Sequence, residues 1–194
     1  MILDSMAYEY RGHEHRNRQK TQLTPRQTTT AAIRPAGLGQ QWRPSVTVRT
    51  LRDTDFEAWL LLWNGYNAFY GREGPTALDP EITKTTWRRF FDPNEPVFAM
   101  VAEAEGKLLG LTHFLHHRST TRIEPTTYLQ DLFTAPEARG QGVGRALIEA
   151  VYAVAKSSGI KRVYWQTHQS NTAGRRLYDK VAKHHGFVVY ARDV

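Results

Sequence analysis

A combination of glycine and arginine that suits an anion occurs in the segment Arg139-Gly140-Gln141-Gly142-Val143-Gly144-Arg145. Glycine adopts backbone angles that other residues avoid, and it lets the backbone approach a ligand closely. The apolar residues that follow are spaced as in a helix, and the N-terminus of a helix offers unpaired N–H groups and a partial positive charge. Arg139 and Arg145 add charge on either side. The segment therefore predicts a cradle for a phosphate or pyrophosphate group.

Two common phosphate motifs do not fit this segment. A dinucleotide fingerprint requires a third glycine at the position of Arg145. A nucleotide P-loop requires Lys and then Ser or Thr after its last glycine, whereas Arg145 and Ala146 follow Gly144. A plain glycine turn between a strand and a helix remains the alternative.

Histidine is the other residue type in this sequence whose side chain can bind a metal or transfer a proton. A metal site would require several ligands at a suitable spacing, and His113 and His117 share one face of an expected strand without a carboxylate partner at such a spacing. We therefore expect surface or hydrogen-bonded histidines and no metal. The chain has no cysteine, which excludes disulfides, thiolate zinc sites and cysteine nucleophiles. The histidines concerned are His113, His116, His117, His168, His184 and His185.

The elements that must position these residues follow from hydrophobic periodicity and turn signals. A hairpin precedes two strand–helix–strand units, which predicts a mixed α+β fold with right-handed crossovers in the second half. Residues 118–127 form a polar loop. The expected strands are 46–51, 97–103, 107–117, 128–134, 162–167 and 187–191, and the expected helices are 56–70, 80–91, 142–158 and 171–184.

Charge is distributed unevenly along the chain. The sequence has 26 basic and 19 acidic residues, a formal net charge of +7. Residues 1–44 contain few apolar residues and no periodicity, which predicts a disordered basic tail followed by one domain over residues 45–194. A functional arm that binds nucleic acid or protein is the alternative for the tail. The mildly basic remainder argues against a large nucleic-acid face, and the lack of a long apolar run predicts no membrane span and a cytoplasmic protein.

The run from Tyr128 to Leu147 resembles the acetyl-CoA motif of the GNAT superfamily of N-acetyltransferases. That motif reads Arg/Gln-x-x-Gly-x-Gly/Ala after a strand, and here Arg139, Gly142 and Gly144 meet it. The resemblance extends over about residues 46–191. It implies a central mixed, mostly antiparallel sheet flanked by helices, with acetyl-CoA between splayed strands of the second half. Two further blocks are similar to the family: Asn171, Ala173, Leu177, Tyr178, Gly186 and Phe187, and, more weakly, Val48, Arg49, Asp53 and Asp55.

The resemblance implies direct transfer of an acetyl group from acetyl-CoA to an amine in a ternary complex, without a metal. Backbone groups of Leu132, Phe133 and Thr134 would pair with the pantetheine arm. Asn171 would contact CoA at the start of the next helix. The pyrophosphate would be held by Arg139, Gly140, Gln141, Gly142, Val143, Gly144 and Arg145.

The resemblance also implies catalytic roles. Tyr178 matches the general acid that protonates the leaving thiolate, with a packed helix tyrosine as the alternative. Gln130 stands where polyamine-acetylating relatives often have Glu, and an amide cannot accept a proton at neutral pH. Asp131 is the candidate base, alone or behind a water held by Gln130, and a structural carboxylate is its alternative.

The acceptor is left open. The closest likeness is to small-amine, polyamine and histone-type members. A small amine or polyamine, an amino acid and a protein lysine therefore all remain candidate acceptors. A homodimer is among the expected assemblies. Most of the aromatic residues in 59–70 should be core, although Tyr66 or Tyr70 could hold an acceptor cation. The competing hypothesis is a non-catalytic acyl-CoA-binding regulatory module, which Gln130 permits and Tyr178 opposes.

Overall fold

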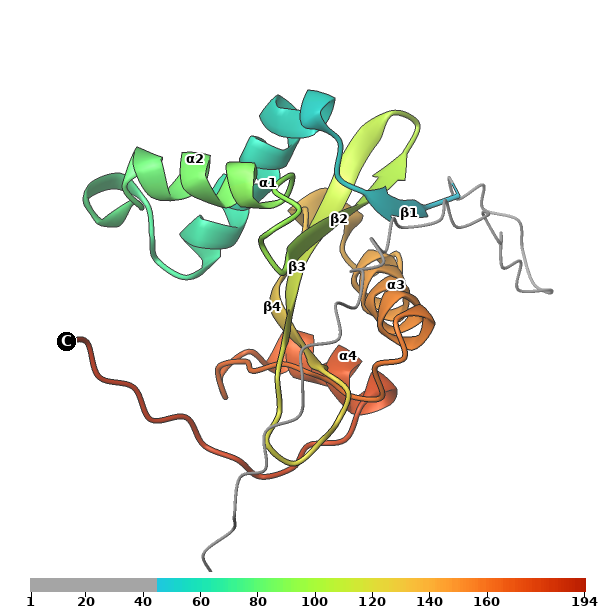
Figure 1. The fold of residues 1–194 in the computed structure, drawn as a ribbon. Helices are drawn as coiled ribbons and strands as arrows, with labels where there is room; N and C mark the ends of the chain where they lie inside the picture. The colour runs from blue at the N-terminus through green and yellow to red at the C-terminus, as the bar shows by residue number, and fades with distance from the viewer. Residues whose placement is uncertain (1–44) are drawn as a thin grey trace, which may run out of the picture. The chain divides into compact units, whose positions relative to one another are not determined.

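A five-stranded sheet forms the centre of residues 45–194, the part of the chain that the computed structural model describes (Figure 1). The strands lie in the order β1-β2-β3-β4-β5. All neighbours are antiparallel except β4 and β5, which confirms the predicted mixed, mostly antiparallel sheet. The predicted tail, residues 1–44, lies outside the described residues. The strands are β1 (Thr47–Thr50), β2 (Val97–Ala104), β3 (Lys107–His117), β4 (Thr126–Thr134) and β5 (Val163–Tyr164).

Helices cover both faces of the sheet (Figure 1). Helices α1 (Phe56–Phe69) and α2 (Pro80–Arg89) lie over one face, and α3 (Val143–Ser157) lies over the other. Helix α4 (Thr172–Val181) packs beside α3. Short 3-10 turns occur at Asp53–Asp55, Gly74–Thr76 and Pro136–Ala138. Within residues 45–194, no helix is both long and apolar enough to cross a membrane.

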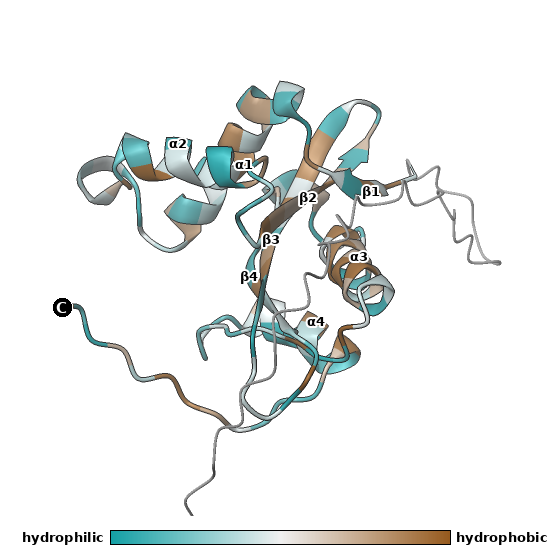
Figure 2. Ribbon diagram, viewed as in Figure 1, coloured by the Kyte–Doolittle hydropathy of each residue, from teal (hydrophilic) through white to brown (hydrophobic). Residues whose placement is uncertain are grey.

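The core consists of two clusters of buried side chains. Trp59, Trp63 and Phe133 belong to the larger cluster, which residues of α3 also join. Phe114 and Ile148 belong to the cluster beneath α3. The buried residues of α3 recur at steps of one, three and four, so one stripe of the helix faces the sheet, as the brown ribbon in Figure 2 shows. The stripe consists of Val143, Leu147, Ile148, Val151 and Ala155.

Strand β4 contains the irregularity that shapes the second half of the sheet. His113 of β3 lies opposite Asp131, but the next residue, Phe114, lies opposite Leu129, so Gln130 is an extra residue in β4. Such a bulge bends a strand and increases its twist. Strands β4 and β5 pair only through Thr127 with Val163 and Tyr128 with Tyr164. Among residues 45–194, this edge of β4 therefore has no strand neighbour beyond Tyr128.

The prediction of a final strand at 187–191 was wrong. Helix α4 ends at Val181 because Ala182 is extended, and no strand follows it. Strand β5 is also shorter than the predicted 162–167, so it offers almost no edge for a neighbour to pair with. The second strand–helix–strand unit is consequently incomplete. The apolar side chains of this segment are largely exposed: Phe187, Val188, Val189 and Tyr190.

Candidate active site

The glycine segment forms the connection between β4 and α3. Gly140 and Gly142 have φ angles of 74° and 88°, in the left-handed region that favours glycine. Gly142 is the N-cap of α3, and no side chain caps this helix. A Cβ atom at either glycine would meet no other atom within 4 Å, so the space over the turn is open. The exposed side chains of Arg139 and Arg145 flank it.

Gly144 serves a different purpose from the two glycines before it. A Cβ atom at Gly144 would lie 3.2 Å from Cδ2 of Leu177 and 3.5 Å from Oγ1 of Thr134. The absent side chain thus lets the first turn of α3 approach both β4 and α4. This contact brings the glycine turn, the end of β4 and the helix that carries Tyr178 into one neighbourhood.

Asn171 is the N-cap of α4. Its Oδ1 accepts a hydrogen bond from the Gly174 N–H at 3.0 Å, and its Nδ2 donates to Oγ1 of Thr167 at 3.0 Å. The side chain expected to contact CoA therefore already has protein partners at both ends of its amide. In this structure Asn171 fixes the start of α4 and ties it to the segment after β5.

Tyr178 lies on α4 against the cluster to which β4 contributes Leu129 and Leu132. Its ring contacts Trp165 edge-on, with centroids 5.4 Å apart. Burial raises the pKa of Tyr178 to about 12. The charge that Tyr70 carries when it is ionised acts in the same direction, and a hydrogen bond with Thr167 acts against both. The phenol is therefore protonated at neutral pH and able to donate a proton.

Gln130 and Asp131 have opposite environments. The Gln130 side chain is exposed, whereas Asp131 is 8% exposed and lies beneath α1. The Asp131 carboxylate is 2.9 Å from Nδ1 of His113, and the Trp59 indole N–H donates to Nε2 of His113 at 3.0 Å. An indole nitrogen only donates, so Nε2 of His113 accepts and the ring proton sits on Nδ1. The Nδ1–H of His113 then donates to the Asp131 carboxyl group.

Tyrosines surround this carboxylate. Burial raises the pKa of Tyr66 most, and the charge of Asp131 and a hydrogen bond with Asp131 raise it further. Arg72 lowers this pKa. Burial first and Asp131 second also raise the pKa of Tyr70. The pKa of Tyr128 responds to burial, to Tyr164 and to Asp131 in the same direction. Asp131 thus lies near three tyrosines, and its presence raises the pKa of each of them.

The histidines of β3 are hydrogen-bonded, as expected. His116 pairs with Oγ1 of Thr127 at 3.0 Å, and His117 pairs with the Tyr164 hydroxyl at 3.1 Å. Among the described residues, no three His, Asp or Glu side chains group as metal ligands would. Sequence reasoning missed the pairing of His113 with Asp131, because that pairing depends on the register of β3 against β4.

Arg72 was also missed. Its guanidinium carbon lies 5.6 Å from the ring centroid of Tyr66 and 5.4 Å from that of Tyr70. A cation of the chain itself therefore occupies the position over these two rings that sequence reasoning had offered to an acceptor. The prediction that most of these aromatic residues are core is confirmed, because Trp59, Trp63 and Tyr66 are buried, while Phe69 and Tyr70 are exposed.

An open strand edge beside a glycine-rich helix N-terminus, on a sheet covered by helices on both faces, defines an acetyltransferase fold. The chain belongs to the acetyltransferase (GNAT) family, whose family model matches residues 58–187. It is an acetyl-CoA-dependent N-acetyltransferase, in agreement with the resemblance noted in its sequence.

Individual relatives support this assignment. The chain is 36% identical to the D-amino-acid N-acetyltransferase HPA3 of Saccharomyces cerevisiae over 150 residues, which cover 76% of this chain and 91% of the relative. It is 34% identical to the phosphinothricin N-acetyltransferase of Alcaligenes faecalis over 143 residues, covering 70% and 68%. The solved structure of AAC(6')-Iy in complex with a bisubstrate analogue shares the fold, with a TM-score of 0.65, 18% identity and coverage of 77% and 98%.

Proposed function

We propose that the enzyme acetylates the amino group of a small molecule, with acetyl-CoA held between β4 and α4. The observation that carries this proposal is the free edge of β4 beyond Tyr128, which leads into the open glycine turn. Backbone groups of Leu132, Phe133 and Thr134 pair with the pantetheine arm along this edge. The first N–H groups of α3 and the charges of Arg139 and Arg145 hold the pyrophosphate.

The glycine turn contributes through its backbone and its shape. Gly140 and Gly142 provide the left-handed angles, and Gln141 and Val143 lie between and after them. Gly144 allows the close approach of α4. Asn171 acts here as the cap that positions α4, because its amide is already engaged by Thr167 and Gly174.

Tyr178 is proposed as the general acid. The neutral amine attacks the acetyl carbonyl carbon, and the nitrogen of the tetrahedral intermediate loses its second proton to water. The intermediate then collapses, the C–S bond breaks, and the phenol proton passes to the departing sulfur. A phenol with a pKa of about 12 is fully protonated when this step begins. Solvent then returns a proton to the tyrosine.

Asp131 is proposed as the group that attracts the acceptor ammonium and takes its proton, directly or through water. Amines of the lysine type have a pKa near 10.4, so they arrive protonated at neutral pH and need a proton acceptor. His113 donates through Nδ1 to one oxygen of this carboxyl group and orients it. The Gln130 side chain is exposed, and its amide accepts no proton.

The acceptor belongs among small amine-bearing molecules in this proposal. The yeast relative is named for a D-amino acid and the Alcaligenes faecalis relative for phosphinothricin, so amino acids belong beside polyamines and lysine peptides in any survey. A cytoplasmic location and a homodimer stay predictions.

A thiol-release assay with acetyl-CoA tests the proposal on the purified full chain. We expect CoA release that depends on at least one small amine and that Tyr178→Phe reduces without loss of acetyl-CoA binding. Binding of acetyl-CoA without transfer to polyamines, amino acids or lysine peptides would instead favour the regulatory module.

A further inference from the structure

Arg72 is held in an unusually defined position for an arginine in a connecting segment. Gly71, with a φ of 72°, turns the chain after α1 so that the Arg72 N–H donates to the Asn67 carbonyl at 2.9 Å. The Arg72 Nε also donates to Oδ1 of the same Asn67 at 2.9 Å. Asn67 is buried, and its Nδ2 donates to the Trp63 carbonyl at 2.9 Å. The backbone and the side chain of Arg72 are thus both hydrogen-bonded to the buried residue Asn67.

The terminal nitrogens of Arg72 remain uncommitted. Within residues 45–194, the Arg72 guanidinium donates only through Nε and pairs with no carboxylate. Its planar group lies over the rings of Tyr66 and Tyr70, and Tyr70 is 43% exposed, so solutes reach this corner of the site. Two parallel N–H donors at the end of a fixed guanidinium match the two oxygens of a carboxylate.

The Asp131 carboxyl group, which pairs with Nδ1 of His113 at 2.9 Å, lies at the other end of Tyr66. The ring of this tyrosine contacts Arg72, and its hydroxyl interacts with Asp131. Tyr66 is 8% exposed and stacks on Trp63 at 5.4 Å between centroids, so the distance between the two charges is set by the core. The site therefore presents a fixed cation and a fixed anion, separated by one aromatic side chain.

We propose that Arg72 binds the carboxylate of an α-amino acid acceptor while Asp131 and Tyr66 face its ammonium group. An α-amino acid carries a carboxylate and an ammonium group on one carbon, so a single acceptor would meet both Arg72 and Asp131. A polyamine offers no partner for Arg72 and brings a second positive charge near it. The inference rests on the proposed transferase function and narrows its acceptor to zwitterions.

The test compares acceptors that differ only at the carboxyl group. Phenylalanine and phenylalaninamide, each as both enantiomers, and putrescine are assayed with acetyl-CoA on the wild type, Arg72→Gln and Arg72→Lys. For each acceptor, the kcat/KM of the variant is divided by that of the wild type, which removes differences in the intrinsic reactivity of the amines. Arg88→Gln, at an exposed arginine of α2, is the matched control.

We expect Arg72→Gln to lower kcat/KM for phenylalanine about 10- to 100-fold, mainly through KM, since a hydrogen bond to a charged group is worth about 1.5–3 kcal/mol. The values for phenylalaninamide should change little, and putrescine should be used as well or better. Arg72→Lys retains the positive charge but lacks the two parallel N–H donors. Its kcat/KM for phenylalanine should fall between the values of the wild type and Arg72→Gln. Equal losses for phenylalanine and its amide, or no loss, would overturn the inference and leave the transferase function intact.

Binding separates the two proposals if no amine turns over. Titration calorimetry of phenylalanine into the CoA-loaded protein should detect binding in the wild type and in Arg88→Gln but not in Arg72→Gln. That result without turnover would refute the transferase proposal and keep the carboxylate site. A wild type that neither binds nor acetylates either enantiomer refutes the carboxylate site itself.

Discussion

The indole N–H of Trp59 donates to Nε2 of His113 at 3.0 Å, although the two residues are 54 positions apart in the chain. This contact joins α1 to β3 and decides which imidazole nitrogen carries the proton. Through His113 it also decides which atom faces Asp131 on β4. A core tryptophan thus determines the hydrogen-bonding state of the carboxylate in the candidate site.

Replacing Trp59 with phenylalanine should therefore destabilise the protein beyond the loss of packing. Nε2 of His113 would be left buried without its donor, which costs about 1–3 kcal/mol in free energy of unfolding. Trp63→Phe is the control, because that indole donates to the Thr83 hydroxyl in a half-buried position where water can replace it. Urea denaturation measures both. Equal losses for the two variants would contradict the special role of the Trp59 contact.

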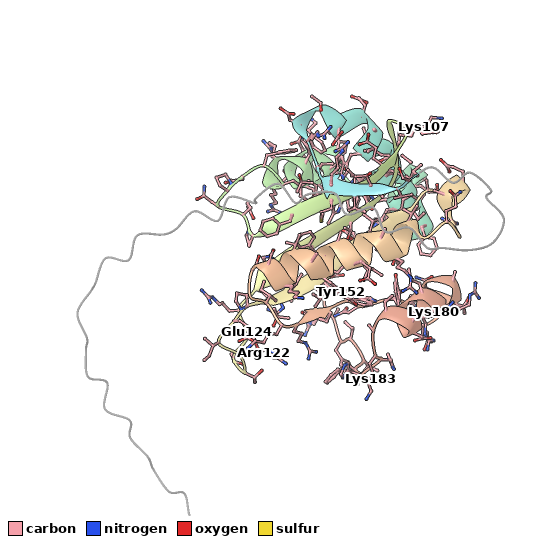
Figure 3. The ribbon with its side chains drawn as sticks, turned by 90° about the vertical axis from the view of Figure 1, so that its right-hand side faces the viewer. Lys107, Arg122, Glu124, Tyr152, Lys180 and Lys183 are labelled. Atoms are coloured by element: carbon pink, nitrogen blue, oxygen red, sulfur yellow. The ribbon has the colours of Figure 1, made fainter. Side chains whose placement is uncertain are left out.

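Tyr178→Phe should lower kcat about 10²- to 10⁴-fold, the range of general acid catalysis, with the lower end expected because CoA is a moderately good leaving group. Acetyl-CoA affinity should hardly change. Tyr152→Phe is the control, since its hydroxyl donates to the Val181 carbonyl at 3.1 Å on the side of α3 that faces α4 (Figure 3). Steady-state kinetics and calorimetry separate the two effects. A folded Tyr178→Phe variant with full activity would refute the acid role.

The pH dependence of the reaction should show no alkaline limb from Tyr178 in the usual range. Burial raises the pKa of this phenol to about 12, so the proton that it donates stays in place as the pH rises. The rate should instead increase with pH as more acceptor amine loses its proton. A profile of kcat/KM from pH 6 to about 10.5 tests this. A decline below pH 10 that disappears in Tyr178→Phe would show that the phenol titrates earlier.

Two substitutions at Gly142 separate backbone strain from charge. Gly142→Ala places a Cβ atom at a φ of 88° and meets no neighbouring atom, so its cost is conformational. Gly142→Asp adds a negative charge at the helix N-terminus where the pyrophosphate is expected. Calorimetry with CoA should show a much larger loss of affinity for the Asp variant at similar melting temperatures. Similar affinities would place the pyrophosphate elsewhere.

Asp55→Asn should destabilise the protein at neutral pH but not at acid pH. Arg49 pairs with Asp55 at 2.6 Å and with Glu103 at 2.6 Å, linking β1, the turn before α1 and β2. The hydrogen bond with Arg49 lowers the pKa of Asp55 below its ordinary 3.8. The stabilisation is therefore present above that value and lost as the pH falls through the lower folded-state pKa.

Thermal unfolding at pH 7 and below pH 3 measures this difference. Asp53→Asn, at an exposed neighbour, is the control and should change little at either pH. If Asp55→Asn still has a lower melting temperature than the wild type in acid, the packing of Asp55, rather than its ion pair, would be responsible for the loss of stability.

The local parts of the site could be predicted from the sequence, and the long-range parts could not. The glycine turn and Tyr178 belong to short motifs whose spacing is visible in the chain. The pairing of His113 with Asp131 depends on the register between β3 and β4, which the bulge at Gln130 shifts by one residue. Arg72 belongs to no motif, and only the turn at Gly71 brings it over Tyr66 and Tyr70.

Most of the fold followed from periodicity, because the strands and helices of residues 47–157 alternate with clear turn signals. The end of the chain did not. Phe187, Val188, Val189 and Tyr190 have the composition of a strand, but a strand requires a neighbouring edge, and β5 offers only two paired residues. Composition alone could not reveal that this edge is so short.

The two-residue pairing of β4 with β5 leaves part of the β4 edge without a strand neighbour among residues 45–194. A pantetheine arm lying along β4 would supply the missing hydrogen-bonding partner, so the ligand would act as part of the sheet. Acetyl-CoA at 100 times its Kd would add about 2.7 kcal/mol to the stability of the folded state, and amide hydrogens along β4 would exchange more slowly. In the proposed arrangement the CoA product would occupy the same edge. Its departure would undo that pairing, which makes product release a natural candidate for the slow step of the catalytic cycle.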